Sequence, residues 1–172
     1  MFLSDYTSDE CIFIDANIFI YNALDNPIYA GSCSDFLMLV ETDKIKAVIT
    51  PMVMDEVLFK ILVAEASQHI DKFNIWNLKK KMKDPIFSSA VYKPVKEYNE
   101  YLIELTYAGL EILDINERTI KKSIILGEKY GLLTTDAIHL AAMKQYEIIY
   151  LASNDSDFDK VDFIKVYKPN NQ

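Results

Sequence analysis

The 172-residue sequence predicts a three-layer α/β/α fold with a mostly parallel sheet of about five strands. Three observations support this prediction. The apolar run at residues 11–14 stops at Asp15, which is typical of a short strand covered on both faces. Short apolar runs then alternate with helical segments along the whole chain. No repeat or low-complexity linker divides the sequence, so residues 1–172 are expected to form a single domain.

The strands are recognised as short runs rich in apolar and β-branched residues, bounded by turn residues. They are expected at about residues 11–15, 46–50, 111–115, 148–152 and 163–167. In open parallel sheets, ligands bind where the strands end at the carboxyl edge. Residues that directly follow a strand are therefore the first candidates for chemistry.

Two helices carry clear terminal signals. Thr50 and Pro51 form an N-cap followed by proline at the first helical position, which opens a helix to about residue 66. Asn116 can cap a helix over residues 117–130, and Gly131 ends it. Further helices are expected at about residues 17–24, 28–42, 69–84, 95–109 and 134–146, with residues 87–95 as the least regular stretch.

The composition, with 51% hydrophobic and 26% charged residues, is that of a globular protein. No apolar stretch reaches the roughly 18 residues that cross a bilayer. The first residues lack the basic start and apolar run of a signal peptide, so no membrane association and a cytoplasmic location are expected. Cys11, in the first strand, and Cys33, in a helix, are expected to be buried thiols.

Charge is distributed unevenly along the chain. The net charge of −8 disfavours a polyanionic partner when it is taken as a sum. Residues 69–96, however, hold seven lysines and two aspartates, or +5, whereas the remainder holds 11 basic and 24 acidic residues, or −13. Residues 69–96 are therefore interpreted as a lysine-rich helical insertion in an acidic domain.

Three aspartates occur at the ends of expected elements, and each has a structural explanation beside a functional one. Asp15 follows the first strand and can cap the next helix. Asp155 follows the fourth strand in a sequence of ordinary turn composition. Asp136 lies in the first turn of a helix, where an acid complements the helix dipole.

Glu56 is harder to explain structurally, because most of the residues on its face of the helix are apolar. These neighbours are Met52, Val53, Phe59, Lys60 and Val63. A buried carboxylate is costly unless it is paired or binds a metal, and pairing with Lys60 is the structural alternative. Carboxylate clusters suit Mg²⁺ or Mn²⁺, and the sequence has no zinc spacing, P-loop or nucleophile motif.

Four segments occur in a characteristic order: residues 13–21 (FIDANIFIY), Glu56, residues 134–142 (TTDAIHLAA) and residues 153–158 (SNDSDF). Together they resemble the PIN-domain nucleases, and most closely the VapC type of toxin ribonuclease. The resemblance implies a parallel sheet with acids at its carboxyl edge and Mg²⁺- or Mn²⁺-dependent cleavage of RNA. The stretch between Glu56 and Asp136 is longer than is usual in this family's compact toxins and includes the lysine-rich segment.

The resemblance also assigns roles to residues. The catalytic and metal-binding quartet that it implies is Asp15, Glu56, Asp136 and Asp155. Asp157 could replace or assist Asp155 as a metal ligand. Asn17 and Ser153 match polar positions that support the acids, whereas His139 is interpreted as structural.

The functional expectation is a metal-dependent endoribonuclease, acting as the toxin of a toxin–antitoxin pair. Its implied partners are RNA, an antitoxin protein and a second copy of the chain. The alternative is a non-catalytic PIN-like scaffold that binds RNA or protein. A phosphatase of the haloacid-dehalogenase type is a less favoured alternative, because that class needs a second aspartate at the position that Asn17 occupies.

The lysine-rich segment suggests an RNA contact of its own. Lys79, Lys80, Lys81 and Lys83 are candidates for phosphate contacts, and aromatic residues such as Trp76 are interleaved with them. The structural alternative is that Phe73 and Trp76 make core or dimer contacts while the lysines form a solvated face.

Overall fold

The computed structural model describes residues 1–171, and its centre is a five-stranded parallel sheet. The strand order is β3-β2-β1-β4-β5, and every neighbouring pair is parallel. The strands are β1 (Ile12–Ile14), β2 (Ala47–Ile49), β3 (Leu110–Ile112), β4 (Tyr150–Ala152) and β5 (Lys165–Tyr167). The predicted α/β fold is confirmed, although each strand is only three residues long.

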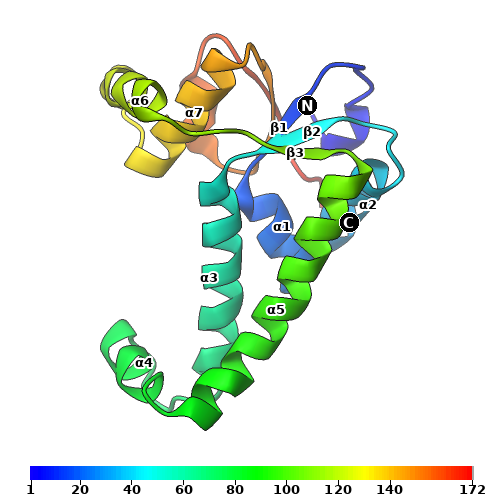
Figure 1. Cartoon of the computed structure of the whole chain (residues 1–172). Helices are drawn as coiled ribbons and strands as arrows, with labels where there is room; N and C mark the ends of the chain where they lie inside the picture. Colours follow the sequence, from blue (N-terminus) through cyan, green and yellow to red (C-terminus); the bar gives the residue numbers. More distant parts are fainter. Residues whose placement is uncertain (172) are drawn as a thin grey trace.

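The helices form two groups around this sheet. The α-helices of the described chain are α1 (Ala16–Ala23), α2 (Ala30–Glu41), α3 (Pro51–Gln68), α4 (Ile75–Lys81), α5 (Pro85–Ala108), α6 (Glu117–Tyr130) and α7 (Thr134–Gln145). Helix α6 packs on α7, whereas α1 packs on α2 and α3, and α3 packs on α5. Figure 1 shows α6 and α7 on one side of the sheet and α2 and α5 on the other.

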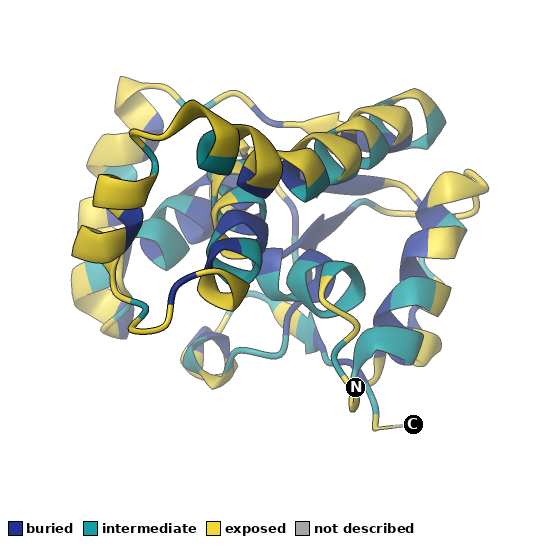
Figure 2. Cartoon of the chain, turned by 90° about the horizontal axis from the view of Figure 1, so that it is seen from below, coloured by how far each residue is buried: buried dark blue, intermediate teal, exposed yellow. Residues whose placement is uncertain are grey.

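The core lies between these layers. All three residues of β1 are fully buried, as expected for a central strand covered on both faces. Figure 2 shows the dark blue, buried strands inside a shell of helices whose outer faces are exposed. Cys33 is buried as expected, but Cys11 precedes β1 and is only half-buried; both are free thiols. No helix among residues 1–171 has the length and apolar character needed to span a membrane.

The strongest terminal signals in the sequence mark real helix ends. Helix α3 begins at Pro51 and α6 begins after Asn116, whose side chain accepts hydrogen bonds from the amides of Arg118 and Thr119. Gly131 ends α6 with a φ of 61°, a left-handed conformation that favours glycine. Thr50 lies at the N-cap of α3, but its hydroxyl bonds to the ring of His139 instead of capping the helix.

Two predictions for the middle of the chain are wrong. The helix expected over residues 69–84 is confined to α4, because the Asn74 side chain accepts from the amide of Asn77 and starts the helix there. The stretch at 87–95, expected to be irregular, lies within α5. Asp84 caps this helix, which continues through Pro94.

Helices α3 and α5 pack along each other and extend away from the sheet, with α4 at their far end (Figure 1). The lysine-rich segment, residues 69–96, consists of α4, its flanking turns and the first half of α5. Phe73 is half-buried and packs against the core. A core position for Trp76 is wrong, because 80% of its surface is exposed.

Candidate functional site

A pocket of about 290 Å³ brings the four predicted acids together. Its lining consists of Asp15, Asn17, Tyr21, Glu56, Asp136, Asn154 and Asp155. The acids come from four separate parts of the chain: the end of β1, the second turn of α3, the first turn of α7 and the loop after β4. The parallel strand order places these segments at one edge of the sheet, as expected for ligand sites in such folds.

Asp15 is the most buried of the four acids and is held by three donors. It is the N-cap of α1, where its Oδ1 accepts from the Ala16 amide at 2.7 Å. Its Oδ2 accepts from the Ser153 hydroxyl at 2.6 Å and from the side-chain amide of Asn17. The structural and functional interpretations of Asp15 are therefore compatible, because one carboxylate caps the helix and also lines the pocket.

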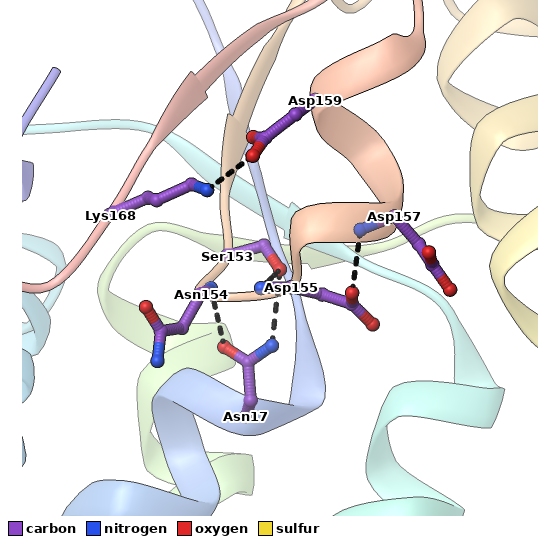
Figure 3. Close-up of polar contacts among 7 residues, drawn as sticks. All are labelled: Asn17, Ser153, Asn154, Asp155, Asp157, Asp159 and Lys168. Atoms are coloured by element: carbon purple, nitrogen blue, oxygen red, sulfur yellow. Dashed lines mark hydrogen bonds and ion pairs between the residues drawn. The ribbon is translucent and has the colours of Figure 1, made fainter.

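Ser153 organises this region with a hydroxyl that uses its donor and both acceptor positions. It donates to Asp15 and accepts from the Asn17 side chain and the Asp155 amide, both at 3.0 Å. Asn17 is fixed from its other end, because its Oδ1 accepts from the Asn154 amide at 3.1 Å. Figure 3 shows the contacts of Asn17 with Ser153 and with the Asn154 amide, and the contact of Ser153 with the Asp155 amide. The two supporting residues thus fix the carboxylate and the loop that carries Asp155.

Three acids in this region form a close group. Asp136, Asp155 and Asp157 each offer a carboxylate oxygen within 4.8 Å of the others. The Asp157 amide donates to Asp155 Oδ1 at 2.8 Å, which Figure 3 shows, and this fixes the start of a 3₁₀ turn at Ser156–Lys160. Lys160 lies 3.5 Å from Asp157 in a half-exposed ion pair. Glu56 and Asp15 line the same pocket outside this closest group.

The acids make ionisation unfavourable for one another. The pKa of Asp15 is raised to about 7, mainly by burial and also by the charges of Asp136 and Glu56, against the opposing hydrogen bonds from Ser153 and Ala16.

Asp136 shows the same behaviour. Burial raises its pKa to about 6, with further contributions from Asp155, Glu56 and Asp157, whereas Lys160 acts in the opposite direction. The pocket therefore holds more negative charge than its own cations offset.

The donor set fits a hard divalent cation. It consists of carboxylate oxygens from separate segments, three of which lie within 4.8 Å of one another, and a divalent cation would offset their negative charge. Neither cysteine lines the pocket. His139 is buried with its Nδ1 2.9 Å from the Thr50 hydroxyl, and burial lowers its pKa to about 4.

Sequence reasoning missed three residues of this region. Tyr21 and Asn154 line the pocket, and the Asn154 side chain donates to the Tyr21 hydroxyl at 3.2 Å. Tyr21 lies four residues after Asn17 on a helix, a spacing that could have revealed the shared face. Nothing local indicated Lys160, whose position depends on the turn after Asp155. The four candidate RNA-binding lysines lie outside the pocket, on α4 and the turn that follows it.

Together, the fold and site define a parallel α/β protein with a pocket at the carboxyl edge of its sheet whose charged lining residues are all carboxylates. A family model described as "PIN domain" matches residues 12–164, and the chain belongs to the PIN-domain family. The resemblance to the VapC type is also confirmed by two relatives from Methanocaldococcus jannaschii. One, named Ribonuclease VapC6, is 35% identical over 155 residues, covering 89% of this chain and 97% of the relative. The other, Ribonuclease VapC2, is 30% identical over 163 residues, covering 90% of this chain and 91% of the relative.

Solved structures share the fold at lower sequence identity. A toxin–antitoxin complex from Klebsiella pneumoniae matches with a TM-score of 0.56 and 17% identity, covering 90% of this chain and 95% of that one. VapBC2 from Rickettsia felis, bound to a DNA fragment from its promoter, matches with a TM-score of 0.55 and 15% identity, covering 94% of this chain and 100% of that one. These similarities support the same fold.

Proposed function

We propose that this protein is a metal-dependent endoribonuclease that acts as the toxin of a toxin–antitoxin pair. The observation that carries the proposal is the convergence of Asp15, Glu56, Asp136 and Asp155 on one pocket at the carboxyl edge of the sheet. Relatives that match nearly the whole chain are named as ribonucleases, which supports RNA as the substrate. Mg²⁺ or Mn²⁺ is the proposed cofactor, because the donors are carboxylate oxygens.

In this mechanism, the quartet would hold the cation, with Asp157 as an additional ligand. When bound, the cation would supply Lewis acidity toward water and toward the phosphodiester oxygens. Ser153 and Asn17 hold the Asp15 carboxylate in one orientation, so that the pocket needs little rearrangement on binding. The side chains of Asn154 and Tyr21 are hydrogen-bonded to each other and line the pocket, where they would contact the substrate.

The proposal extends to partners. The structures with the same fold include toxin–antitoxin complexes, which supports an antitoxin protein as the regulator. A homodimer and a cytoplasmic location stay predictions, which sedimentation of the purified protein and cell fractionation would test.

The direct test is cleavage of RNA by the purified protein with Mn²⁺, and with a chelator in its place. Asp136→Asn should reduce cleavage by at least about 100-fold, since it removes a proposed metal-binding carboxylate from the lining of the pocket. The matched control is Asp9→Asn, which changes an exposed aspartate outside this pocket. Equal cleavage by Asp136→Asn and the parent protein would contradict the mechanism.

A further inference from the structure

The lysine-rich segment carries positive charge that the protein itself does not neutralise. Its seven lysines are Lys72, Lys79, Lys80, Lys81, Lys83, Lys93 and Lys96. Within residues 1–171, the ion pairs involve only Lys121, Lys129, Lys160, Lys168 and His69 as cations. None of the seven lysines therefore has a carboxylate of the described residues within ion-pair distance, and this charge is available to an external anion.

The lysines of α4 and its flanking turns differ in what surrounds them. Lys81 Nζ donates to the His69 carbonyl at 2.6 Å and lies 5.2 Å from the centroid of the Phe87 ring, so it stabilises the turn itself. Lys72 and Lys80 line a pocket of about 680 Å³ beside α4. Lys79 and Lys83 are exposed. Within residues 1–171, the ammonium groups of Lys72, Lys79, Lys80 and Lys83 donate no hydrogen bond, and of these four only Lys79 lies over an aromatic ring, that of Trp76.

Trp76 is exposed on the same short helix. Although tryptophan is among the most apolar side chains, 80% of its surface is in contact with solvent, and Lys79 Nζ lies 5.7 Å from its ring centroid. An exposed aromatic ring beside lysines is the combination with which proteins bind single-stranded nucleic acid, because bases stack on the ring while phosphates contact the cations.

The position of α4 relative to the acidic pocket suits a substrate that spans both. Twelve residues of α3 separate Glu56 from Gln68 at the end of the helix, which corresponds to about 18 Å. Figure 1 shows α4 projecting to the same side of α3 as α6 and α7. At about 3.4 Å per stacked nucleotide, roughly five nucleotides would cover this distance. Because the rest of the chain carries −13, a polyanion would be drawn to this segment.

We propose that α4 and its flanking turns form an RNA-anchoring site distinct from the catalytic pocket. Lys72, Lys79, Lys80 and Lys83 contact phosphates, and Trp76 stacks on an unpaired base. The proposal rests on the proposed function, because it assigns the RNA substrate a second point of attachment. Its consequence is a preference for RNA with an unpaired stretch long enough to reach from the pocket to α4.

The first experiment uses Trp76 as a local reporter, since it is the only tryptophan of the chain. The Asp136→Asn protein, which should bind RNA without cutting it, is titrated in Mg²⁺ buffer with single-stranded RNA of about 20 nucleotides. Stacking should quench the tryptophan emission as the RNA binds, and Trp76→Phe should weaken binding. Binding detected by anisotropy of labelled RNA with no change in Trp76 emission would overturn the stacking contact.

The second experiment measures the salt dependence of the same binding. Replacing Lys72, Lys79, Lys80 and Lys83 by Gln should reduce the slope of log affinity against log salt by about 0.7 for each lost phosphate contact. A matched variant loses the same charge elsewhere, by replacing the exposed Lys44, Lys46, Lys144 and Lys165, and should leave the slope near that of the parent. Equal slopes for the two fourfold variants would overturn the proposal.

Two further outcomes separate this proposal from its alternatives. If the α4 variant binds RNA like the parent but loses binding to phosphatidylglycerol vesicles, the surface recognises a membrane and the proposal is wrong. If the parent protein cuts no RNA in any metal, the nuclease function fails, but the fluorescence and salt slopes still report whether α4 binds RNA. The two failures are therefore distinguishable.

Discussion

The buried carboxylate of Asp15 has an electrostatic cost in the folded protein. Three hydrogen-bond donors stabilise its ionised form, yet burial and the neighbouring acids still raise its pKa to about 7. The unfolded chain exposes this carboxyl group to water and has no such penalty. The folded protein therefore carries a strained electrostatic arrangement that a bound cation would relieve.

The first prediction concerns the pH dependence of stability without metal. Because the pKa of Asp15 rises from 3.8 to about 7 on folding, the folded state binds this proton more tightly than the unfolded state. The contribution of Asp15 to the free energy of unfolding is therefore largest at low pH and is lost as the pH rises from about 4 to about 7. Asp136, with a pKa raised to about 6, acts in the same direction.

Thermal unfolding in a chelator should report this effect. Asp15→Asn should raise the Tm at pH 8 by several degrees relative to the parent and change it little near pH 4. Asp9→Asn, at an exposed site, serves as the control. A Tm difference between Asp15→Asn and the parent that does not vary with pH would show that the Asp15 carboxyl is not strained.

The second prediction tests Ser153 as a positioning residue. Ser153→Ala removes the donor to Asp15 and the acceptor for the Asp155 amide, which loosens both acids at once. We expect Mn²⁺ affinity to fall about 10- to 100-fold, in line with other supporting contacts at metal sites. Isothermal titration calorimetry with Mn²⁺ measures this affinity. The control is Ser67→Ala, on the exposed end of α3. Unchanged Mn²⁺ affinity would assign Ser153 a purely structural role.

At the scale of elements, the sequence predicted those helices whose signals are local. Thr50-Pro51 and Asn116 mark helix starts that depend on a few neighbouring residues, and the structure has both. Helix α5 was harder to predict, because Pro94 lacks the amide that a helix interior uses. Burial of Val91, Val95, Leu102 and Leu105 against the core supports the helix on both sides of that proline. Such long-range packing is not visible in a local pattern.

The hydrogen bond between Thr50 and His139 joins the two helices that carry Glu56 and Asp136. Thr50 directly precedes α3, and His139 lies one turn after Asp136 in α7. Both side chains are buried, and burial keeps the imidazole neutral by lowering its pKa to about 4. Within residues 1–171, Nε2 of this ring has no partner, so the Thr50 bond is its one polar contact in the described chain.

The third prediction follows from this contact. Thr50→Val preserves the shape of the side chain but leaves the buried imidazole without a partner, which costs about 1–3 kcal/mol of unfolding free energy. Thr50→Ser should restore most of the loss, because it restores the hydroxyl. Chemical denaturation of the two variants measures the difference. Equal stability of the Val and Ser variants would show that the hydrogen bond does not contribute.

At the scale of the molecule, the sequence predicted the convergence of the four acids better than the direction of the helices. Asp15 and Asp155 follow expected strands and Asp136 lies in the first turn of an expected helix, whereas Glu56 lies in the second turn of the helix after β2. Parallel strands bring such positions to one edge of the sheet. What the sequence could not give was the direction of α3 and α5, which carry α4 away from the sheet (Figure 1). The exposure of Trp76 follows from that direction, since no neighbouring element covers it. The position of Trp76 is therefore set by the tertiary structure and not by a local sequence pattern.

The last prediction tests whether the pocket as a whole acts as a metal site. Mn²⁺ at about 100 times its dissociation constant should stabilise the folded protein by about 2.7 kcal/mol, which corresponds to a Tm increase of roughly 5–10 °C. The increase should be larger at pH 8 than at pH 5.5, because Asp15 and Asp136 have raised pKa values and must lose their protons to bind a cation. The Asp136→Asn variant should lose most of this Tm increase.

A non-catalytic scaffold with this fold would respond differently. Surface carboxylates bind Mn²⁺ weakly, so a scaffold would show a small Tm increase that is the same for Asp136→Asn and Asp9→Asn. The pH dependence separates the two cases further, because only buried acids with raised pKa values compete with protons for the metal near neutral pH. A Tm increase that is independent of both pH and Asp136 would therefore contradict a metal site in the pocket, and with it the nuclease mechanism.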